Sequence, residues 1–248
     1  MSNVDEHRVL SAHQPNYWPY PGLIGKIMRA DKFLYMSEVQ LEKQSWQMRN
    51  RIRTIDGWRY LGVPVYIKGK SDQRIIDAEI DNTSNWRGKT KGMIQMYYGK
   101  SKYYDEFRDF INEVYSIKWT SLNELDIYIM NYILEKLEIQ TEILYDTNYE
   151  FEGKKTELLI DYCNKLDCNM YMSNLGSAAY VQINEFNAAN IDHIFIDYKP
   201  VTYEQCYPGC EQGLSILDML MNCGTEKTKE ILMDDDNFRF SELNEKLV

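Results

Sequence analysis

Hydrophobic positions along this chain follow two different periods. Short apolar runs typical of buried strands occupy residues 8–12, 32–36, 142–145, 169–172 and 192–197. Apolar residues recur at helical spacing over residues 22–30, 103–115, 122–137, 156–166, 180–190 and 215–222. Strands that alternate with helices pair in parallel, and the helices pack above and below the sheet. The pattern therefore predicts an α/β fold with a mostly parallel sheet and helices on both faces.

Two local signals refine this assignment in the middle of the chain. Residues 58–67 predict another strand, in which Pro64 implies a sheet edge or a bulge. Ser121 and Glu124 have the spacing of a capping box, which indicates the start of a helix at the residues that follow Ser121.

The carboxyl-terminal part carries one stop signal and one acidic run. Gly224 is placed to end the last predicted helix. The acidic residues 234–236 lie in a polar stretch, so residues 234–248 are expected to form a mobile tail. No internal repeat or low-complexity linker divides the chain, and we therefore expect residues 1–248 to form a single domain.

Composition narrows the class of protein. Hydrophobic residues are 44% and charged residues 27%, which is ordinary for a globular domain. No apolar run is long enough to cross a bilayer, and the first residues are polar and acidic, so neither a membrane span nor a signal peptide is expected. The net charge of -10 argues against nucleic acid as a partner. Five cysteines without a Cys-x-x-Cys pair indicate neither a disulfide framework nor a zinc site, so we expect a cytoplasmic protein without a metal.

Positive charge is concentrated between Lys43 and Lys118, although the chain as a whole is acidic. A basic segment in an acidic protein suggests an anionic small ligand such as a phosphate or a carboxylate. Within it, Arg49, Asn50 and Arg51 have the residue types of an oxyanion clamp, because an arginine fork matches two oxygens at once. We expect this clamp to face the cleft of the loop described next. A solvated surface rich in charge is the alternative.

A proline-rich loop, residues 13–21, follows the first predicted strand. Each of its three prolines fixes its own backbone torsion, so the loop presents its side chains with little entropy left to lose. Open α/β sheets bind ligands at the carboxyl ends of their strands. His13 is therefore a candidate general base, and Gln14 and Asn16 are candidates for hydrogen bonds to a ligand. A rigid structural turn is the alternative.

A second candidate loop lies between a predicted strand and a predicted helix. Its small residues, among them Ser173 and Gly176, leave backbone N–H groups free to bind an anion or an oxyanion. Lys26 follows the 13–21 loop by about the length of a helix, so it is expected either to reach back to a phosphate or to be a solvated helix residue.

Asp218 has two interpretations. It lies three residues after Ser215, where both residues are placed to cap the last helix. A general base also needs a partner that orients its ring, and Asp218 and Glu38 are the acids expected to do so for His13. Asp218 is therefore carried as a second candidate catalytic residue.

The run that starts at His13 resembles the opening of the WbqC-like protein family, in which a His-Gln-Pro-x-Tyr-x-Pro start precedes a Gly, a Lys-Ile pair and an Ala-Asp pair. The matches are His13, Gln14, Pro15, Tyr17, Pro19, Gly22, Lys26, Ile27, Ala30 and Asp31. Further matches are Ser45, Trp46, Arg49, Asn50, Arg51, Ile52, Val63, Pro64, Trp86, Lys155, Thr156, Ser173, Gly176, Tyr180, Gln205 and Leu214 to Asp218. The resemblance spans nearly the whole chain.

This resemblance implies a role in the biosynthesis of O-antigen and other surface polysaccharides. Some members carry a glycine-transferase label on amino sugars, which implies transfer of an acyl or aminoacyl group to the amine of a nucleotide-linked amino sugar, without a cofactor. It also implies that Tyr17 and Gln205 bind substrate. The chain departs from the family at Ser37 and Glu38, where members show two aspartates.

Three functions follow from these observations. In a transferase, His13 would take the proton of the attacking amine, residues 173–176 would hold the oxyanion, and Arg49 and Arg51 would hold the diphosphate. A non-catalytic nucleotide-sugar-binding or scaffold protein of polysaccharide assembly would have the same pocket. The third is another sugar-processing transferase. A glycosyl transferase usually has an Asp-x-Asp metal motif, and the closest match here lies in the polar stretch 234–236, where a metal site is not expected. A homo-oligomer is compatible with each.

Overall fold

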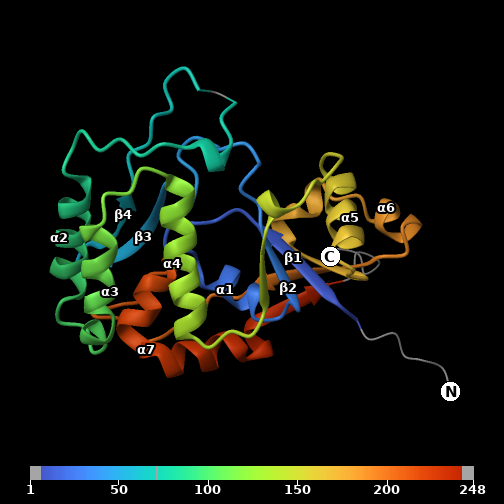
Figure 1. The fold of residues 1–248 in the computed structure, drawn as a ribbon. Helices are drawn as coiled ribbons and strands as arrows, with labels where there is room; N and C mark the ends of the chain where they lie inside the picture. Colours follow the sequence, from blue (N-terminus) through green and yellow to red (C-terminus); the bar gives the residue numbers. More distant parts are fainter. Residues whose placement is uncertain (1–6, 71, 242–248) are drawn as a thin grey trace.

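The computed structural model describes residues 7–70 and 72–241. Within these residues, one sheet contains six strands in the order β5-β2-β1-β6-β7-β8. The strands are β1 Val9–His13, β2 Lys32–Tyr35, β5 Glu142–Tyr145, β6 Met170–Asn174, β7 Asp192–Tyr198 and β8 Phe238–Ser241. Neighbours pair in parallel from β5 to β7, and β8 is antiparallel to β7. The predicted mostly parallel α/β sheet is confirmed (Figure 1).

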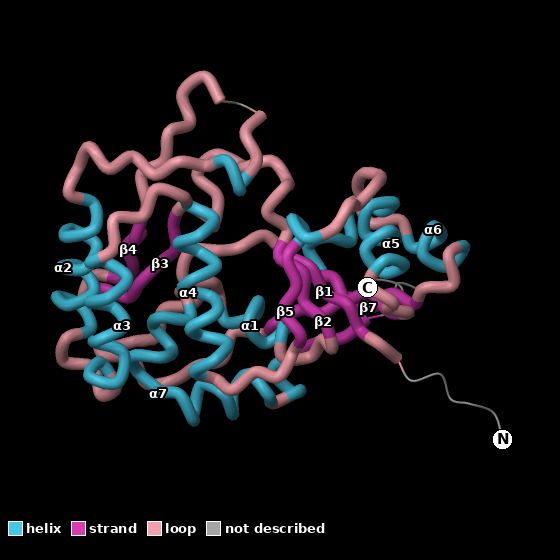
Figure 2. The backbone as a smooth tube through the Cα atoms, in the orientation of Figure 1, coloured by secondary structure: helices cyan, strands magenta, loops and turns pink. Residues whose placement is uncertain are grey.

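Helices cover both faces of this sheet (Figure 2). They are α1 Pro21–Ile27, α2 Trp86–Tyr98, α3 Tyr104–Ser116, α4 Leu122–Lys136, α5 Thr156–Lys165, α6 Ile183–Ala188 and α7 Ile216–Met233. Phe33 and Tyr35 of β2 belong to the apolar cluster formed with α1, α4 and α7. Leu34 between them belongs to the cluster formed with α5 and α6. Successive strand residues point to opposite faces, so this apolar strand is buried on both sides.

Strand β1 lies near the centre of the sheet, and the later strands are added first on one side of β1 and then on the other. On one side β2 follows directly after α1, whereas β6 joins the other side only after β5 and α5. This reversal is a topological switch point, and it leaves a crevice outside the carboxyl ends of the two strands that flank it. His13 ends β1 and Asn174 ends β6. The fold therefore places the 13–21 loop where doubly wound α/β proteins bind ligands.

A large insertion separates β2 from β5 and forms the left side of Figure 1. It contains α2, α3, α4 and a two-stranded hairpin of β3 Arg49–Thr54 and β4 Gly57–Gly62. The strand predicted over residues 58–67 is shorter than expected, because it ends before Pro64. The helix α2 was not predicted, since Gly88 and Gly92 interrupt its apolar pattern.

Helix α7 continues beyond its predicted stop. At Gly224 the torsion φ is 73°, which kinks the helix, and helical structure then resumes as far as Met233. A Cβ at Gly224 would lie 2.6 Å from the Tyr103 ring, and the Tyr103 N–H donates to the Met221 carbonyl at 3.2 Å. The glycine was correctly placed as a break, but packing against Tyr103 lets the helix continue after it.

The expectation of a mobile tail is wrong for residues 234–241. Phe238–Ser241 form β8, which adds an antiparallel edge to β7. Phe238 is buried, and the Arg29 guanidinium carbon lies 3.8 Å from the centre of its ring. Burial of the Phe238 ring stabilises the strand, even though the acidic residues before it favour solvent. The rest of the expected tail, residues 242–248, lies outside the described residues.

Candidate functional site

A pocket of about 410 Å³ opens at the carboxyl ends of β1 and β6. Its walls come from β1, α1, α5, β6 and the short 3-10 helix Leu175–Ala179. The basic side chains that line it are His13, Lys26 and Lys155, and none of its described lining residues is aspartate or glutamate. An acid-free pocket with basic side chains is suited to an anionic ligand.

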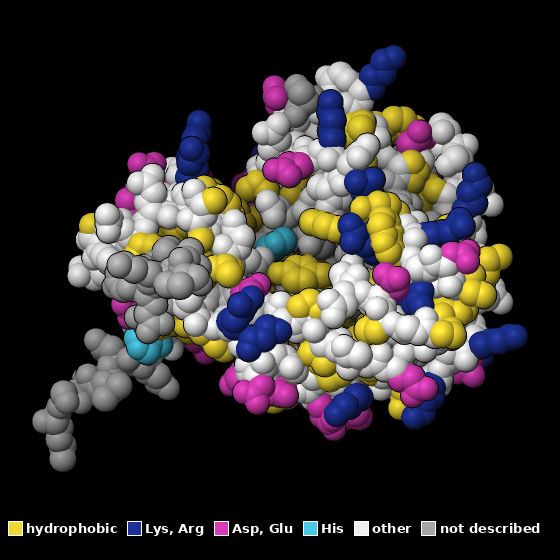
Figure 3. Space-filling view, turned by 180° about the vertical axis from the view of Figure 1, so that it is seen from behind, with side chains coloured by type: hydrophobic (Ala, Val, Ile, Leu, Met, Phe, Trp, Pro, Cys, Tyr) yellow, Lys and Arg dark blue, Asp and Glu magenta, His cyan; other side chains and the backbone are white. Residues whose placement is uncertain are grey.

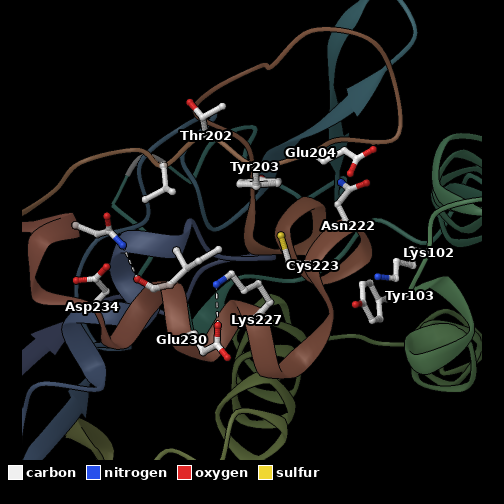
Figure 4. Close-up of a pocket in the computed structure, with 13 residues that line it drawn as sticks. Lys102, Tyr103, Thr202, Tyr203, Glu204, Asn222, Cys223, Lys227, Glu230 and Asp234 are labelled. Atoms are coloured by element: carbon white, nitrogen blue, oxygen red, sulfur yellow. Dashed lines mark hydrogen bonds and ion pairs between the residues drawn. The ribbon is translucent and has the colours of Figure 1, made fainter.

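A larger cavity of about 830 Å³ lies elsewhere, between α7 and the segment after β7 (Figure 4). Positively and negatively charged side chains both line it, and Lys227 and Glu230 form an ion pair of 2.7 Å within its wall. His13 does not line this cavity. We therefore assign the candidate site to the smaller pocket, where the switch point and unpaired basic groups coincide.

His13 lines this pocket, and one of its ring nitrogens is free to accept a hydrogen bond. Its Nδ1 lies 2.9 Å from the carbonyl oxygen of Gln14. A carbonyl only accepts, so Nδ1 carries the hydrogen and Nε2 keeps its lone pair. Nε2 has no hydrogen-bond partner among the described residues. Dense surrounding protein, and secondarily the charge of Lys26, lower the pKa of His13 to about 3, so the ring is neutral at neutral pH.

Lys26 is the most unusual group of the pocket. Its side chain is 1% exposed, and its Nζ donates to the Ala12 carbonyl oxygen at 3.2 Å. It has no ion-pair partner among residues 7–70 and 72–241. Burial lowers the pKa of Lys26 to about 7, because an ammonium group loses its hydration there. Of its two expected roles, the solvated helix lysine is excluded.

Ser173 and Gly176 line the same pocket as His13, so the structure brings the two predicted loops together. The Ser173 hydroxyl lies 2.9 Å from Nε2 of His193, which ties that serine to β7. A Cβ on Gly176 would meet no atom within 4 Å, so space does not require a glycine at this position. Gln14 also lines the pocket, beside His13.

Two residues of the 13–21 loop point into the core instead. Asn16 and Tyr17 are buried, at 1% and 0% exposed, and neither lines the pocket. The Asn16 amide donates to the Pro15 carbonyl at 3.0 Å, and the Tyr17 hydroxyl lies 2.5 Å from that of Tyr115. Both side chains therefore anchor the loop in the core and do not line the pocket in which they were expected to bind substrate.

The expected phosphate clamp is absent from this pocket. Arg49, Asn50 and Arg51 lie on β3, and none of the three lines the pocket of His13. The Asn50 side chain donates to the Trp18 carbonyl at 2.7 Å and thereby anchors the 13–21 loop. The arginines and the pocket were expected to share one cleft, but the arginines lie on the β3–β4 hairpin and do not line the pocket.

Gln205 and Asp218 also lie outside the pocket. The Gln205 side chain accepts from Arg53 Nε at 3.1 Å. Asp218 is fully buried and accepts hydrogen bonds from the Tyr98 and Tyr203 hydroxyls, each at 2.7 Å. Burial raises the pKa of Asp218 although these bonds oppose the shift. Both of its oxygens are used by tyrosines, so the Gln14 carbonyl, not Asp218, orients the His13 ring.

Glu38 and Ser215 do not take the roles expected of them in the structure. Glu38 pairs with Arg74 at 2.9 Å and is exposed. Ser215 precedes α7, but its side chain makes no capping bond. The Thr156 hydroxyl accepts from the Gln182 N–H at 3.1 Å, and Lys155 occupies the N-cap position of α5 with φ 55°.

Sequence reasoning missed Lys155, Tyr171 and Tyr180 as pocket residues. Tyr171 alternates with Met172 along β6, so a strand pattern alone could have shown that one of these two faces the pocket side. Nothing local to Lys155 distinguishes it from other surface lysines, because its position depends on how α5 meets β1.

Three further properties concern the described part of the chain. Its cysteines are free thiols. No group of three or more His, Cys, Asp or Glu side chains there is placed to hold a metal ion. No helix in residues 7–70 and 72–241 combines the length and apolar character of a membrane span.

Fold and pocket together define a doubly wound α/β protein with a pocket at its switch point. Comparison with known proteins then places it. The profile of the WbqC-like protein family matches residues 14–230, and the chain belongs to that family. A curated relative, named uncharacterized protein Rv1507c, of Mycobacterium tuberculosis, is 31% identical over 215 residues, which cover 86% of this chain and 93% of the relative. No solved structure shows a significant match.

Proposed function

We propose that this protein is a transferase of surface-polysaccharide biosynthesis that moves an acyl or aminoacyl group, such as glycyl, to the amine of a nucleotide-linked amino sugar. The observation that carries the proposal is Lys26, a buried amine without an acidic partner, beside His13 in a pocket without acids. A cytoplasmic location and a homo-oligomeric state remain predictions.

An anionic substrate explains why Lys26 is buried. A buried ammonium group without a counter-ion is destabilising, so proteins keep one where a ligand or a reaction needs it. The nearest hydrogen-bond acceptor is a neutral carbonyl, that of Ala12, which leaves the charge uncompensated. A carboxylate of the ligand in the pocket would compensate it. The volume, about 410 Å³, lies in the usual range for small-molecule sites.

The same pocket can support acyl transfer. The sugar amine attacks the carbonyl carbon of an acyl donor, a C–N bond forms, and the leaving group departs with the electron pair of its bond. The amine must lose a proton, and a base works best when its pKa lies near the working pH. Lys26, with a pKa of about 7, meets that condition better than His13, with a pKa of about 3. We therefore assign proton transfer to Lys26 and positioning of the amine to His13 Nε2.

The loop after β6 can stabilise the oxyanion of the reaction. Acyl transfer passes through an oxyanion, which backbone N–H groups stabilise when they are fixed in place. The first N–H groups of the 3-10 helix Leu175–Ala179 have no carbonyl within that helix to donate to. Gly176 lies in this turn and lines the pocket. We assign these groups to the oxyanion.

A second candidate function is a nucleotide-sugar-binding protein without turnover. The low basicity of His13 favours it, because a neutral imidazole that is hard to protonate serves recognition better than catalysis. Such a protein would act in polysaccharide assembly as a sensor or scaffold. Ligand binding would then be unchanged, but no product would form.

Thermal shift of the full chain with nucleotide-linked amino sugars tests the proposal. Ligand at 100 times its Kd should stabilise the protein by about 2.7 kcal/mol. Lys26→Gln should reduce the shift, whereas Lys89→Gln, an exposed lysine of α2, should keep it in full. Mass spectrometry of the sugar after incubation with acyl donors then separates enzyme from binding protein. Equal shifts in both variants would remove the basis of the proposal.

A further inference from the structure

The outer face of the β3–β4 hairpin combines arginines with exposed aromatic rings. Arg51 lies opposite Tyr60 in the hairpin, so their side chains share one face. The Arg51 guanidinium carbon lies 4.3 Å from the Trp58 ring centre and 5.9 Å from that of Trp46. The Arg49 guanidinium carbon lies 4.2 Å from the Tyr60 ring centre. We call these five residues the guanidinium–aromatic face.

The two guanidinium groups of this face have unused donors. Neither Arg49 nor Arg51 has an ion pair or a side-chain hydrogen bond to any described residue, and Arg51 Nε is buried without a partner. Arg53 on the same strand differs, because it donates to Gln205 and to the carbonyls of Thr54, Gly57 and Pro208. A guanidinium stacked on a ring keeps its N–H edge directed outward, where it can bind two oxygens at once. These arginines are therefore available for an oxyanion.

Flat apolar surface is available beside these donors. Trp46 is 47% exposed and Trp58 is 41% exposed. The face of the molecule seen from behind Figure 1 is hollowed, and hydrophobic side chains with a Lys or Arg among them stand beside the hollow (Figure 3). Exposed tryptophans provide stacking surface for a base or a sugar ring.

This face lies close to the switch-point pocket. The Trp46 carbonyl accepts a hydrogen bond from the Tyr17 N–H at 3.0 Å. Tyr17 is four residues from His13, a stretch of chain that spans at most about 14 Å. The face and the pocket are therefore separated by no more than the length of one loop, which a ligand with a sugar at one end and a nucleotide at the other can bridge.

We propose that the guanidinium–aromatic face binds the nucleoside diphosphate end of the ligand whose sugar occupies the switch-point pocket. This proposal rests on the proposed function, since that function supplies the nucleotide. Arg49 and Arg51 bind oxygens of the diphosphate through two-point hydrogen bonds. The exposed ring of Trp58 stacks against the base. The face thus holds the substrate while the amine lies beside His13 and Lys26.

Calorimetric titration with uridine diphosphate and thymidine diphosphate, which carry no sugar, tests this face separately from the pocket. For whichever of the two nucleotides binds the wild-type chain, Arg51→Gln should weaken the affinity by about tenfold or more, because it removes a charged two-point contact. Trp58→Ala should weaken it as well. The matched control is Arg59→Gln, an exposed arginine of the same hairpin whose position alternates to the opposite face, and its affinity should stay within about twofold.

Lys26→Gln distinguishes this proposal from the proposed function. It should leave the affinity for the sugar-free nucleotide unchanged and remove only the additional affinity that the amino sugar brings. Suppose that nucleotide binding is lost in Lys26→Gln but kept in Arg51→Gln and Trp58→Ala. The nucleotide would then lie in the pocket, and the proposal that the face binds it would be wrong. No binding of either nucleotide to the wild-type chain would also overturn it. Nucleotide binding through the face, without any gain from a sugar, would support the face and contradict the proposed function.

Two checks keep the result independent of folding. Arg51→Lys retains the charge and loses the fork, so its nucleotide affinity should fall between those of wild type and Arg51→Gln. Each arginine variant should also melt within a few degrees of wild type, since both arginine side chains are only partly buried and bond to no described residue. Full affinity in Arg51→Gln with an unchanged melting temperature would refute the proposal.

Discussion

The ammonium nitrogen of Lys26 lies 3.2 Å from the carbonyl oxygen of Ala12, the residue that precedes His13 at the end of β1. This contact joins α1 to the carboxyl end of the central strand. It also holds a cation in the interior with only a neutral partner. A sequence selected for stability alone would replace such a lysine with an apolar residue, so its burial indicates a site maintained for binding or chemistry.

Lys26→Met should stabilise the protein most at and below pH 7. The folded-state pKa of Lys26, about 7, lies below its ordinary value of 10.5. The folded protein therefore binds fewer protons than the unfolded chain between these values, and wild-type stability rises with pH in that window, by up to about 1.4 kcal/mol per pH unit. Urea unfolding from pH 6.5 to 9.5 should show the advantage of the variant shrinking as pH rises. Lys89→Met should run parallel to wild type, and a constant Lys26→Met advantage would contradict the buried charge.

Binding of an anionic ligand in the switch-point pocket should weaken as pH rises above 7. The protonated form of Lys26 is the one that attracts an anion, and a bound anion raises the pKa of Lys26 from its free value of about 7. Binding therefore takes up protons, and the affinity falls by up to about tenfold per pH unit between the free and bound pKa values. Calorimetry in two buffers of different ionisation enthalpy measures this uptake. Lys26→Gln should show none, and an equal uptake in that variant would assign the effect to another group.

His13→Asn should retain the fold at pH 7 and weaken nucleotide-sugar binding by about tenfold, because a ligand donor would lose its acceptor Nε2. The melting temperature and the affinity are measured on the same preparation. If His13 itself took the proton, turnover would fall by a further factor of about 10² to 10⁴ beyond the loss of binding. A variant that melts several degrees lower yet binds normally would show that His13 is structural.

Gly25→Ala and Gly92→Ala should have opposite effects on stability. Both glycines lie in helices, α1 and α2. A Cβ at Gly25 would overlap the buried ring of Phe238, whereas a Cβ at Gly92 would meet no atom within 4 Å. Gly92→Ala should stabilise by about 0.5–1 kcal/mol through helix propensity, and Gly25→Ala should destabilise by about 1–3 kcal/mol through overpacking. Denaturant unfolding compares them, and equal stability would show that β8 does not pack on α1.

Asp218→Asn should destabilise the protein by about 1–3 kcal/mol and leave ligand binding unchanged. Its carboxylate accepts from the Tyr98 and Tyr203 hydroxyls in a fully buried position, and an amide can accept at only one of its two terminal atoms. Asp105→Asn is the control, since its pair with Arg108 is exposed and contributes less than about 1 kcal/mol. Lost turnover with unchanged stability would instead make Asp218 a catalytic partner.

Much of the fold was predictable because it depends on local periodicity. The apolar runs of β1, β2, β6 and β7 are short and bounded by polar residues, as in strands buried on both faces. The α2 helix escaped prediction because its glycines weaken the helical signal. Strand β8 escaped because one buried side chain, Phe238, outweighs an acidic neighbourhood that is favourable in solvent.

The sequence by itself determined the 13–21 loop as a rigid, polar and aromatic segment after a strand, since prolines and residue types act locally. It could not determine which of these side chains face a ligand. Tertiary packing turned Asn16 and Tyr17 into the core, left His13 in the pocket and separated the arginines of β3 from it. Lys26 shows why. Its residue type gives a charge, but its environment comes from α1 packing across the end of β1, and burial, which depends on distant segments, decides whether that charge is solvated or held for a ligand.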